Sequence, residues 1–217
     1  MADFAQRRTT MVDTQVRPSD VTSFRVLDAM LSVPRELFVP SEQKDAAYAG
    51  VNVPLGRGRV VLAPRTMSKL LQAADIRPDE LVLDVGAGLG YSSALAACMA
   101  EAVIALEEDA VLAGEAERAL SEASADNVAV TSGALVDGAP KHGPYDVVLI
   151  EGAVQDIPDA LVDQLKEGGR IVAIFLEDAL GTARVGYKGG QGVSWRFAFN
   201  AAAPVLPGFE KRREFAL

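Results

Sequence analysis

Short apolar runs alternate with amphipathic segments between residues 81 and 176. The apolar runs are "LVLDV" (81–85), "AVIALE" (102–107), "NVAVTS" (127–132), "YDVVLIEGA" (145–153) and "RIVAIFL" (170–176). The segments between them with apolar residues at helical spacing are "YSSALAACMA" (91–100), "AVLAGEAERALSEA" (110–123) and "IPDALVDQLKEGG" (157–169). Strands that are apolar on both faces are typical of a parallel sheet covered by helices. The pattern therefore predicts an α/β fold with a doubly wound, mostly parallel sheet.

Two polar signals indicate where these helices begin and end. Asp109 precedes a helical stretch and is a suitable N-cap. The glycine pair at 168–169 follows the segment that ends at Leu165 and would close that helix.

The flanking segments follow different patterns. Residues 21–32 place Phe24, Leu27 and Met30 at helical spacing, and the stretch 33–64 is dense in proline and glycine. A second helix is expected at 65–76, and "TARVGYK", "GGQG" and "VSWRFAF" (182–199) predict an antiparallel C-terminal hairpin. We therefore expect a helical and irregular N-terminal lobe, residues 1–78, packed on an α/β domain, residues 79–217, in one compact unit.

Composition and charge narrow the classes of function. The net charge is −9, which argues against a nucleic-acid partner, and no uninterrupted apolar stretch is long enough to span a membrane. The single cysteine and single histidine, Cys98 and His142, cannot assemble a soft-ligand metal site. One cysteine also excludes an internal disulfide and predicts a cytoplasmic location.

The glycines at 86, 88 and 90 follow the first strand of the predicted sheet. In doubly wound sheets, ligands bind beyond the carboxyl ends of the strands, and glycine lets a ligand approach the backbone closely. The spacing is not that of a dinucleotide fingerprint, because Tyr91 stands three residues after Gly88, and no Gly-Lys pair marks a P-loop. The pattern is Asp-x-Gly-x-Gly-x-Gly, beginning at Asp84.

Two carboxylates favour S-adenosylmethionine over a dinucleotide or a nucleoside triphosphate. Glu107 ends the next strand, twenty-one residues after Gly86, where it can accept both ribose hydroxyls of an adenosine. Asp84 lies at the mouth of the turn and would attract an amine or a sulfonium but repel a phosphate. The alternatives remain that Asp84 only caps the turn, and that Glu107 belongs to a solvated charge run.

Several longer stretches resemble one family, the protein-L-isoaspartate O-methyltransferases. They are "MVDTQVR" (11–17), "VLDAMLSVPRELFVP" (26–40), "AAY" (46–48), "VPLGRG" (53–58), "LDVGAGLGYSSALAA" (83–97) and "YDVVLIEGAVQDIPDALVDQLKEGGRIV" (145–172). The resemblance runs in order from about residue 7 to about residue 210. It implies a Rossmann-like class I methyltransferase fold and S-adenosylmethionine as the methyl donor. The implied acceptor is the carboxylate of an isoaspartyl residue in a protein or peptide, in a reaction that starts protein repair.

The resemblance also assigns site residues. Those that would surround S-adenosylmethionine are Asp84, Gly86, Ala87, Gly88, Gly90, Glu107, Glu108, Gly133, Ala134 and Glu151. The acceptor site would contain Arg59, Leu62 and Glu151, without a metal. A carboxylate acceptor is already ionised at neutral pH, so its methylation needs alignment rather than a general base.

The acceptor loop departs from the family pattern. The family reads G-Q-T-I-S-Q-P where this chain has "GRVVLAP" (58–64), so that Leu62 stands in place of the serine. Hydrocarbon at Val60 and Leu62 cannot donate a hydrogen bond to a carboxylate, and burying that charge without partners is costly. Arg59 is a candidate carboxylate clamp, with Thr66 or Ser68 as substitute donors.

Three further positions differ. Gly133-Ala134-Leu135 replaces the family's Gly-Asp-Gly, "AAAPVLP" (201–207) replaces "RFVPL", and Glu151 stands where the family has a small or neutral residue. Glu151 either repels a carboxylate acceptor or forms a salt bridge to Arg59 or Arg65. The sequence therefore favours isoaspartyl methyl transfer by a chain that is expected to be monomeric. The alternatives are another methyl acceptor on the same scaffold and a regulatory protein that binds the cofactor without turnover.

Overall fold

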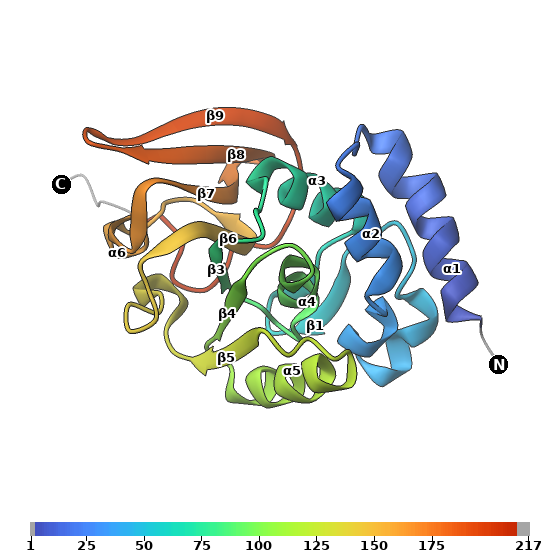
Figure 1. Ribbon diagram of the computed structural model, residues 1–217. Helices are drawn as coiled ribbons and strands as arrows, with labels where there is room; N and C mark the ends of the chain where they lie inside the picture. Colours follow the sequence, from blue (N-terminus) through green and yellow to red (C-terminus); the bar gives the residue numbers. More distant parts are fainter. Residues whose placement is uncertain (1–2, 212–217) are drawn as a thin grey trace.

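The computed structural model describes residues 3–211 and contains a seven-stranded sheet (Figure 1). The strand order is β5-β4-β3-β6-β7-β8-β9. The strands are β3 (Leu81–Val85), β4 (Ala102–Glu107), β5 (Val128–Ser132), β6 (Tyr145–Val154), β7 (Leu165–Glu177), β8 (Leu180–Gly189) and β9 (Gly192–Asn200). Strands β3 to β7 are parallel, and β8 and β9 are added antiparallel at one edge. The predicted fold class is confirmed.

Alternate residues of the strands contribute to two separate cores. On one face Val82, Val147 and Val172 join a core with the N-terminal lobe. On the other face Leu83, Val148 and Ile171 pack against the C-terminal segment. This alternation follows from the two-residue period of a strand, so runs that are apolar throughout fill both faces.

Helices and a hairpin cover the first face (Figure 1). The helices are α1 (Phe4–Met11), α2 (Phe24–Ser32), α3 (Pro64–Ala74), α4 (Tyr91–Ala97) and α5 (Ala110–Glu122). A π-helix (Val12–Val16), three 3₁₀ helices (Arg17–Ser19, Arg35–Phe38, Ser41–Ala46) and the small hairpin β1 (Val53–Gly56) and β2 (Arg59–Val61) complete the lobe. As predicted, the Asp109 carboxylate accepts hydrogen bonds from the N–H groups of Val111 and Leu112 at the start of α5.

Less structure covers the second face. A 3₁₀ helix (Leu135–Asp137), the short α6 (Asp159–Asp163) and the segment after β9 lie there. We expected the helix to continue to Leu165 and to close at the glycine pair, but Leu165 already pairs with Tyr145 in the sheet. The Gln164 carbonyl also accepts the Tyr145 N–H, so the backbone leaves the helix early to join β7.

The apolar stripe of α2 also differs from the prediction in one position. The stripe that faces the core contains Val26, Leu27, Ala29 and Met30, whereas Phe24, the first residue of the helix, is 80% exposed. Cys98 is exposed at the end of α4. Within residues 3–211, no helix is both long enough and apolar enough to cross a bilayer.

An ion pair connects the end of α3 to the sheet. Arg170 on β7 donates two hydrogen bonds to the Glu80 carboxylate, at 2.8 and 2.7 Å. The same guanidinium donates to the carbonyl of Ala74, the last residue of α3. Although burial raises the pKa of Glu80, hydrogen bonds from Arg170 and the Arg77 N–H outweigh burial and lower it. The loop between the lobe and β3 is therefore fixed to the strand that lies two places away in the sheet.

Candidate active site

The glycine turn lies between the carboxyl ends of β3 and β4. The N–H groups of Gly86 and Ala87 both donate to the Leu106 carbonyl, at 2.9 and 3.1 Å. Gly86, Gly88 and Gly90 have φ values of 81°, 59° and 91°, a conformation that strains any residue with a Cβ. A Cβ at Gly90 would meet Leu120 of α5, so this glycine serves helix packing rather than ligand approach.

Glu107 is fully buried at the carboxyl end of β4, beside this turn. Its Oε2 accepts from the Gly88 N–H at 2.7 Å, and its Oε1 accepts from the N–H groups of Glu108 and Asp109 at 3.0 and 3.1 Å. Arg59 completes the set with two parallel hydrogen bonds, at 2.9 and 2.8 Å. Glu107 is thus a structured part of the site and not a solvated surface acid.

Asp84, fully buried on β3, uses only one of its two carboxylate oxygens within the described chain. Its Oδ2 accepts from the hydroxyls of Ser92 and Ser93 at the start of α4, whereas Oδ1 has no hydrogen-bond partner. Burial, opposed by the two serine hydroxyls, and the negative charge of Glu107 raise the pKa of Asp84 to about 6. Asp84 therefore both ties α4 to the turn and leaves one acceptor free in the site.

Glu151 extends the cluster from the neighbouring strand. It lies on β6, which pairs with β3, and it is 4% exposed. Its Oε1 has no partner among the described residues, and burial, followed by the charge of Asp84, raises its pKa well above the usual value. Of the two alternatives left open for Glu151, the salt bridge to Arg59 or Arg65 is not formed, because Arg59 pairs with Glu107 and Arg65 reaches the Asn200 carbonyl at 3.5 Å. Glu151 is therefore harder to ionise than an exposed glutamate.

Arg35 is a buried cation near this cluster that the sequence interpretation missed. Its guanidinium donates to the carbonyls of Ala47 and Leu62 at 2.6 and 2.9 Å and lies over the Tyr91 ring at 4.7 Å, while Nη1 has no partner. Burial lowers its pKa, and the interaction with Tyr91 is the largest effect that opposes burial. The signal in the sequence is a charged pair inside the apolar stretch "SVPRELFVP".

Three side chains fill the space directly over the glycine turn. A Cβ added to Gly86 would lie 2.9 Å from Arg59 Nη2 and 3.1 Å from Leu206 Cδ1, and one added to Gly88 would lie 2.8 Å from Leu55 Cδ1. Leu206 belongs to the predicted variant segment 201–207, which pairs with β6 through the Ala153 backbone. The glycine turn, the Glu107 carboxylate and the unpartnered Asp84 Oδ1 are chemically suited to an adenosyl ligand. Glu107 can accept from such a ligand only when Arg59 gives up its two hydrogen bonds to that carboxylate.

The side chains in and just after the acceptor loop are buried in the core or hydrogen-bonded within the protein. The side chain of Leu62 is fully buried in the core of the first face, and Val60 packs against the same core. The Ser68 hydroxyl donates to the Arg65 carbonyl of its own helix. Ser68 and Thr66, the substitute donors suggested by the sequence, are both buried.

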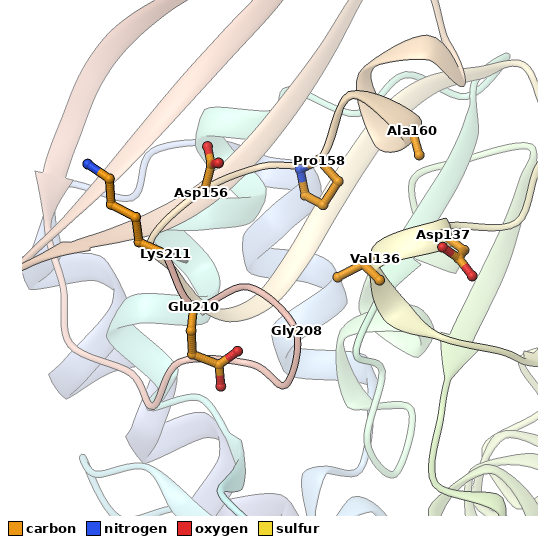
Figure 2. A pocket seen from close by; sticks show the side chains of 8 residues that line it. All are labelled: Val136, Asp137, Asp156, Pro158, Ala160, Gly208, Glu210 and Lys211. Carbon is orange, nitrogen blue, oxygen red and sulfur yellow. The ribbon is translucent and has the colours of Figure 1, made fainter. Parts of the chain in front are cut away.

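Two open cavities are lined by segments that follow the strands of the site or cover them. One, of about 440 Å³, is lined by Arg57, Arg59, Glu108, Asp109, Ala110, Val111 and Pro207. Gly133 and Ala134 are exposed after β5. Beyond them lies a cavity of about 650 Å³ between the 3₁₀ helix at 135–137, the loop before α6 and the segment at 208–211 (Figure 2). Figure 2 shows the carboxylates of Asp137, Asp156 and Glu210 around it. The described residues contain no group of three or more histidine, cysteine or acidic side chains placed to hold a metal.

These features define a class of protein. A parallel sheet with a glycine turn after one strand and a buried carboxylate at the end of the next is the arrangement by which doubly wound α/β proteins hold a nucleoside-containing ligand at the carboxyl edge.

Comparison with known proteins identifies the family. Residues 6–180 match the family model of protein-L-isoaspartate(D-aspartate) O-methyltransferase, and the chain belongs to this family. A Methylorubrum extorquens protein-L-isoaspartate O-methyltransferase is 41% identical over 170 residues, covering 78% of this chain and 74% of the relative. One from Koribacter versatilis is 39% identical over 172 residues, covering 79% and 78%. The resemblance inferred from the sequence is confirmed.

Solved structures share the fold. A protein-L-isoaspartate O-methyltransferase superposes with a TM-score of 0.80 at 21% identity, covering 93% of this chain and 66% of that one. A β-aspartate methyltransferase from Plasmodium falciparum, in complex with S-adenosyl-L-homocysteine, gives the same TM-score at 20% identity and covers 95% and 99%.

Proposed function

We propose that this chain transfers a methyl group from S-adenosylmethionine to the carboxylate of isoaspartyl residues in proteins or peptides. The observation that carries the proposal is the buried Glu107 beside the Gly86–Gly88 turn, in a chain of the isoaspartate methyltransferase family. We further propose that the chain acts as a monomer and that it is located in the cytoplasm, where reducing conditions suit a protein with a single cysteine.

The residues of the turn bind and orient the donor. When bound, S-adenosylmethionine supplies a methyl group on a sulfonium centre that a carboxylate oxygen can attack in line. Glu107 accepts the ribose hydroxyls, and Gly86 and Gly88 let the donor approach the backbone. The free Oδ1 of Asp84 attracts the positive end of the donor. Gly133, Ala134 and Glu108, which are all exposed, are assigned to the adenine subsite in this proposal.

Glu151 is the residue that we assign to the acceptor. A charged Glu151 would repel a carboxylate, but burial and the Asp84 charge raise its pKa and favour the neutral acid. A neutral carboxyl carries an O–H that can donate a hydrogen bond, as the hydroxyls missing at Val60 and Leu62 would have done. Glu151 in this form accommodates an acceptor carboxylate rather than excluding it.

Two measurements test the proposal. Calorimetric titration with S-adenosylhomocysteine is expected to show saturable binding that Glu107→Gln weakens at least tenfold, because an amide accepts only one of two diol hydrogen bonds well. Radiolabelled methyl transfer is expected to an isoaspartyl peptide and not to the same peptide with an ordinary aspartate. Tight cofactor binding without label in the isoaspartyl peptide would refute the assigned acceptor.

One observation favours a second candidate function. The acceptor loop, residues 58–64, has no hydroxyl side chain, Leu62 is buried in the core, and the nearby Ser68 hydroxyl is engaged within its own helix. The same scaffold would then methylate a different acceptor or bind the cofactor without turnover. Label that appears in proteins of a cell extract, but not in the isoaspartyl peptide, would support a different acceptor.

A further inference from the structure

Glu107 accepts more hydrogen bonds than its two oxygens can share with a ligand. Five donors converge on it: three backbone N–H groups, of Gly88, Glu108 and Asp109, and both Nη atoms of Arg59. A carboxylate offers about four lone-pair sites. The three N–H groups are fixed by the turn and by the start of α5, so Arg59 is the one donor that a side-chain rotation can remove.

Arg59 also takes up the space over the glycine turn. Its Nη2 lies 2.9 Å from where a Cβ of Gly86 would be, and the residue is only 4% exposed. The guanidinium is thus hydrogen-bonded to the carboxylate that the ribose hydroxyls of an adenosyl ligand would contact. It also packs against the Gly86 backbone that such a ligand would approach.

We propose that Arg59 determines the affinity of this site, because its guanidinium competes with the ribose hydroxyls of the ligand for Glu107. The inference rests on the proposed function, since it assumes that the site takes an adenosyl ligand. Binding then requires the exchange of two charge-assisted hydrogen bonds from Arg59 for two from the ribose. The exchange lowers the affinity below that of the same site without the arginine.

The structure offers the displaced guanidinium a place to go. Arg59 is the first residue of the three-residue strand β2, directly after the turn at Arg57-Gly58. It already lines the 440 Å³ cavity, whose wall carries the carboxylates of Glu108 and Asp109. Rotation about the Arg59 side chain would bring the cation from Glu107 toward the exposed Glu108, since Asp109 in the same wall is already paired with Arg57.

Calorimetric titration with S-adenosylhomocysteine tests the proposal on four forms of the full chain. Arg59→Gln, which keeps a polar side chain but gives up the paired charge, is expected to bind at least tenfold more tightly than the wild type, about 1.4 kcal/mol. Arg59→Lys, which keeps the charge but not the bidentate geometry, is expected to fall between them.

The matched control is Arg57→Gln. Arg57 lies two residues away in the same hairpin, its side chain is 76% exposed, and it pairs with Asp109 rather than with Glu107. This variant has the same change in net charge and is expected to bind within twofold of the wild type. Thermal unfolding of each form verifies that it is folded; Arg59→Lys retains a cation beside Glu107 and carries the test if Arg59→Gln does not fold.

The possible outcomes separate the two proposals. Binding by all four forms with equal affinity, or weaker binding by both Arg59 variants, overturns the role of Arg59 and leaves the proposed function standing. An equal gain in Arg57→Gln assigns the effect to net charge and also overturns it. No binding by any form at millimolar ligand overturns the proposed function, and with it this inference.

Discussion

Replacing Glu151 by glutamine is expected to stabilise the protein by an amount that grows with pH. Glu151 is 4% exposed, its Oε1 has no partner within the described chain, and burial together with the Asp84 charge raises its pKa well above the usual value. In the unfolded chain the same carboxyl ionises at a pKa of about 4.3. Between these two pKa values the folded state therefore holds one proton more than the unfolded state.

The sign and size of the effect follow from proton linkage. The folded state is favoured by this proton at low pH, and that advantage is lost as the pH rises toward the folded pKa. The loss amounts to about 1.4 kcal/mol per pH unit for a single proton. Glutamine carries no titrating proton, so the unfolding free energy of Glu151→Gln does not show this loss. Between the two pKa values, the difference between the unfolding free energies of Glu151→Gln and the wild type therefore increases by about 1.4 kcal/mol for each pH unit. For a chain of this size this corresponds to roughly 3–6 °C in Tm per unit.

Urea unfolding of both forms at pH 5, 6, 7 and 8 measures the difference directly. Asp84, whose pKa is raised to about 6, titrates in both proteins, so its direct contribution largely cancels in the difference. Glu108→Gln, an exposed change next to Glu107, removes one carboxylate in the same way and serves as the matched control. A difference for Glu151→Gln that does not change with pH would mean that Glu151 is ionised in the fold, and the assignment of a neutral donor would be wrong.

Three further changes have defined outcomes. Arg170→Met should lower the unfolding free energy by roughly 3–5 kcal/mol in urea, because it leaves Glu80 buried without its partner. Gly86→Ala should lower Tm by several degrees and abolish calorimetric binding of S-adenosylhomocysteine, because alanine is strained at φ 81° and its Cβ meets Leu206. Unchanged binding would contradict the assignment of the glycine turn to the ligand site. Ser93→Ala removes a donor to Asp84 and should raise the pKa of that carboxyl, measured by NMR titration; no change would show that the hydroxyl bond is unimportant.

The sequence was sufficient to predict what depends on local pattern. The glycines, the strand ends and the regular alternation of strands and helices are short-range signals, and Glu107 follows from the position where the second strand ends. The N-cap at Asp109 is equally local. The end of α6 was not predictable, because pairing of Leu165 with Tyr145 decided it against the helical pattern.

The contacts between distant side chains could not be read from the sequence. Arg59 and Glu107 are 48 residues apart in the chain. On charge alone, Arg59 could equally have paired with Glu151, and Glu151 with Arg65. The neutral state favoured for Glu151 depends on its burial and on Asp84, which are properties of the folded site. Buried Arg35 has carbonyl partners in two other segments, so its position depends on the whole lobe.

The core shared by the N-terminal lobe and the sheet limits how the site can open. Met11, Leu70 and Val172, from the first helix, the third helix and the sheet, belong to one continuous core. A hinge motion that lifted the lobe would expose that apolar surface to water, at about 25 cal/mol for each Å². Access to Glu107 therefore depends on the rotation of side chains such as Arg59 and not on the separation of two bodies. In the role proposed for Arg59, the site is thus opened by one side chain and not by the movement of a domain.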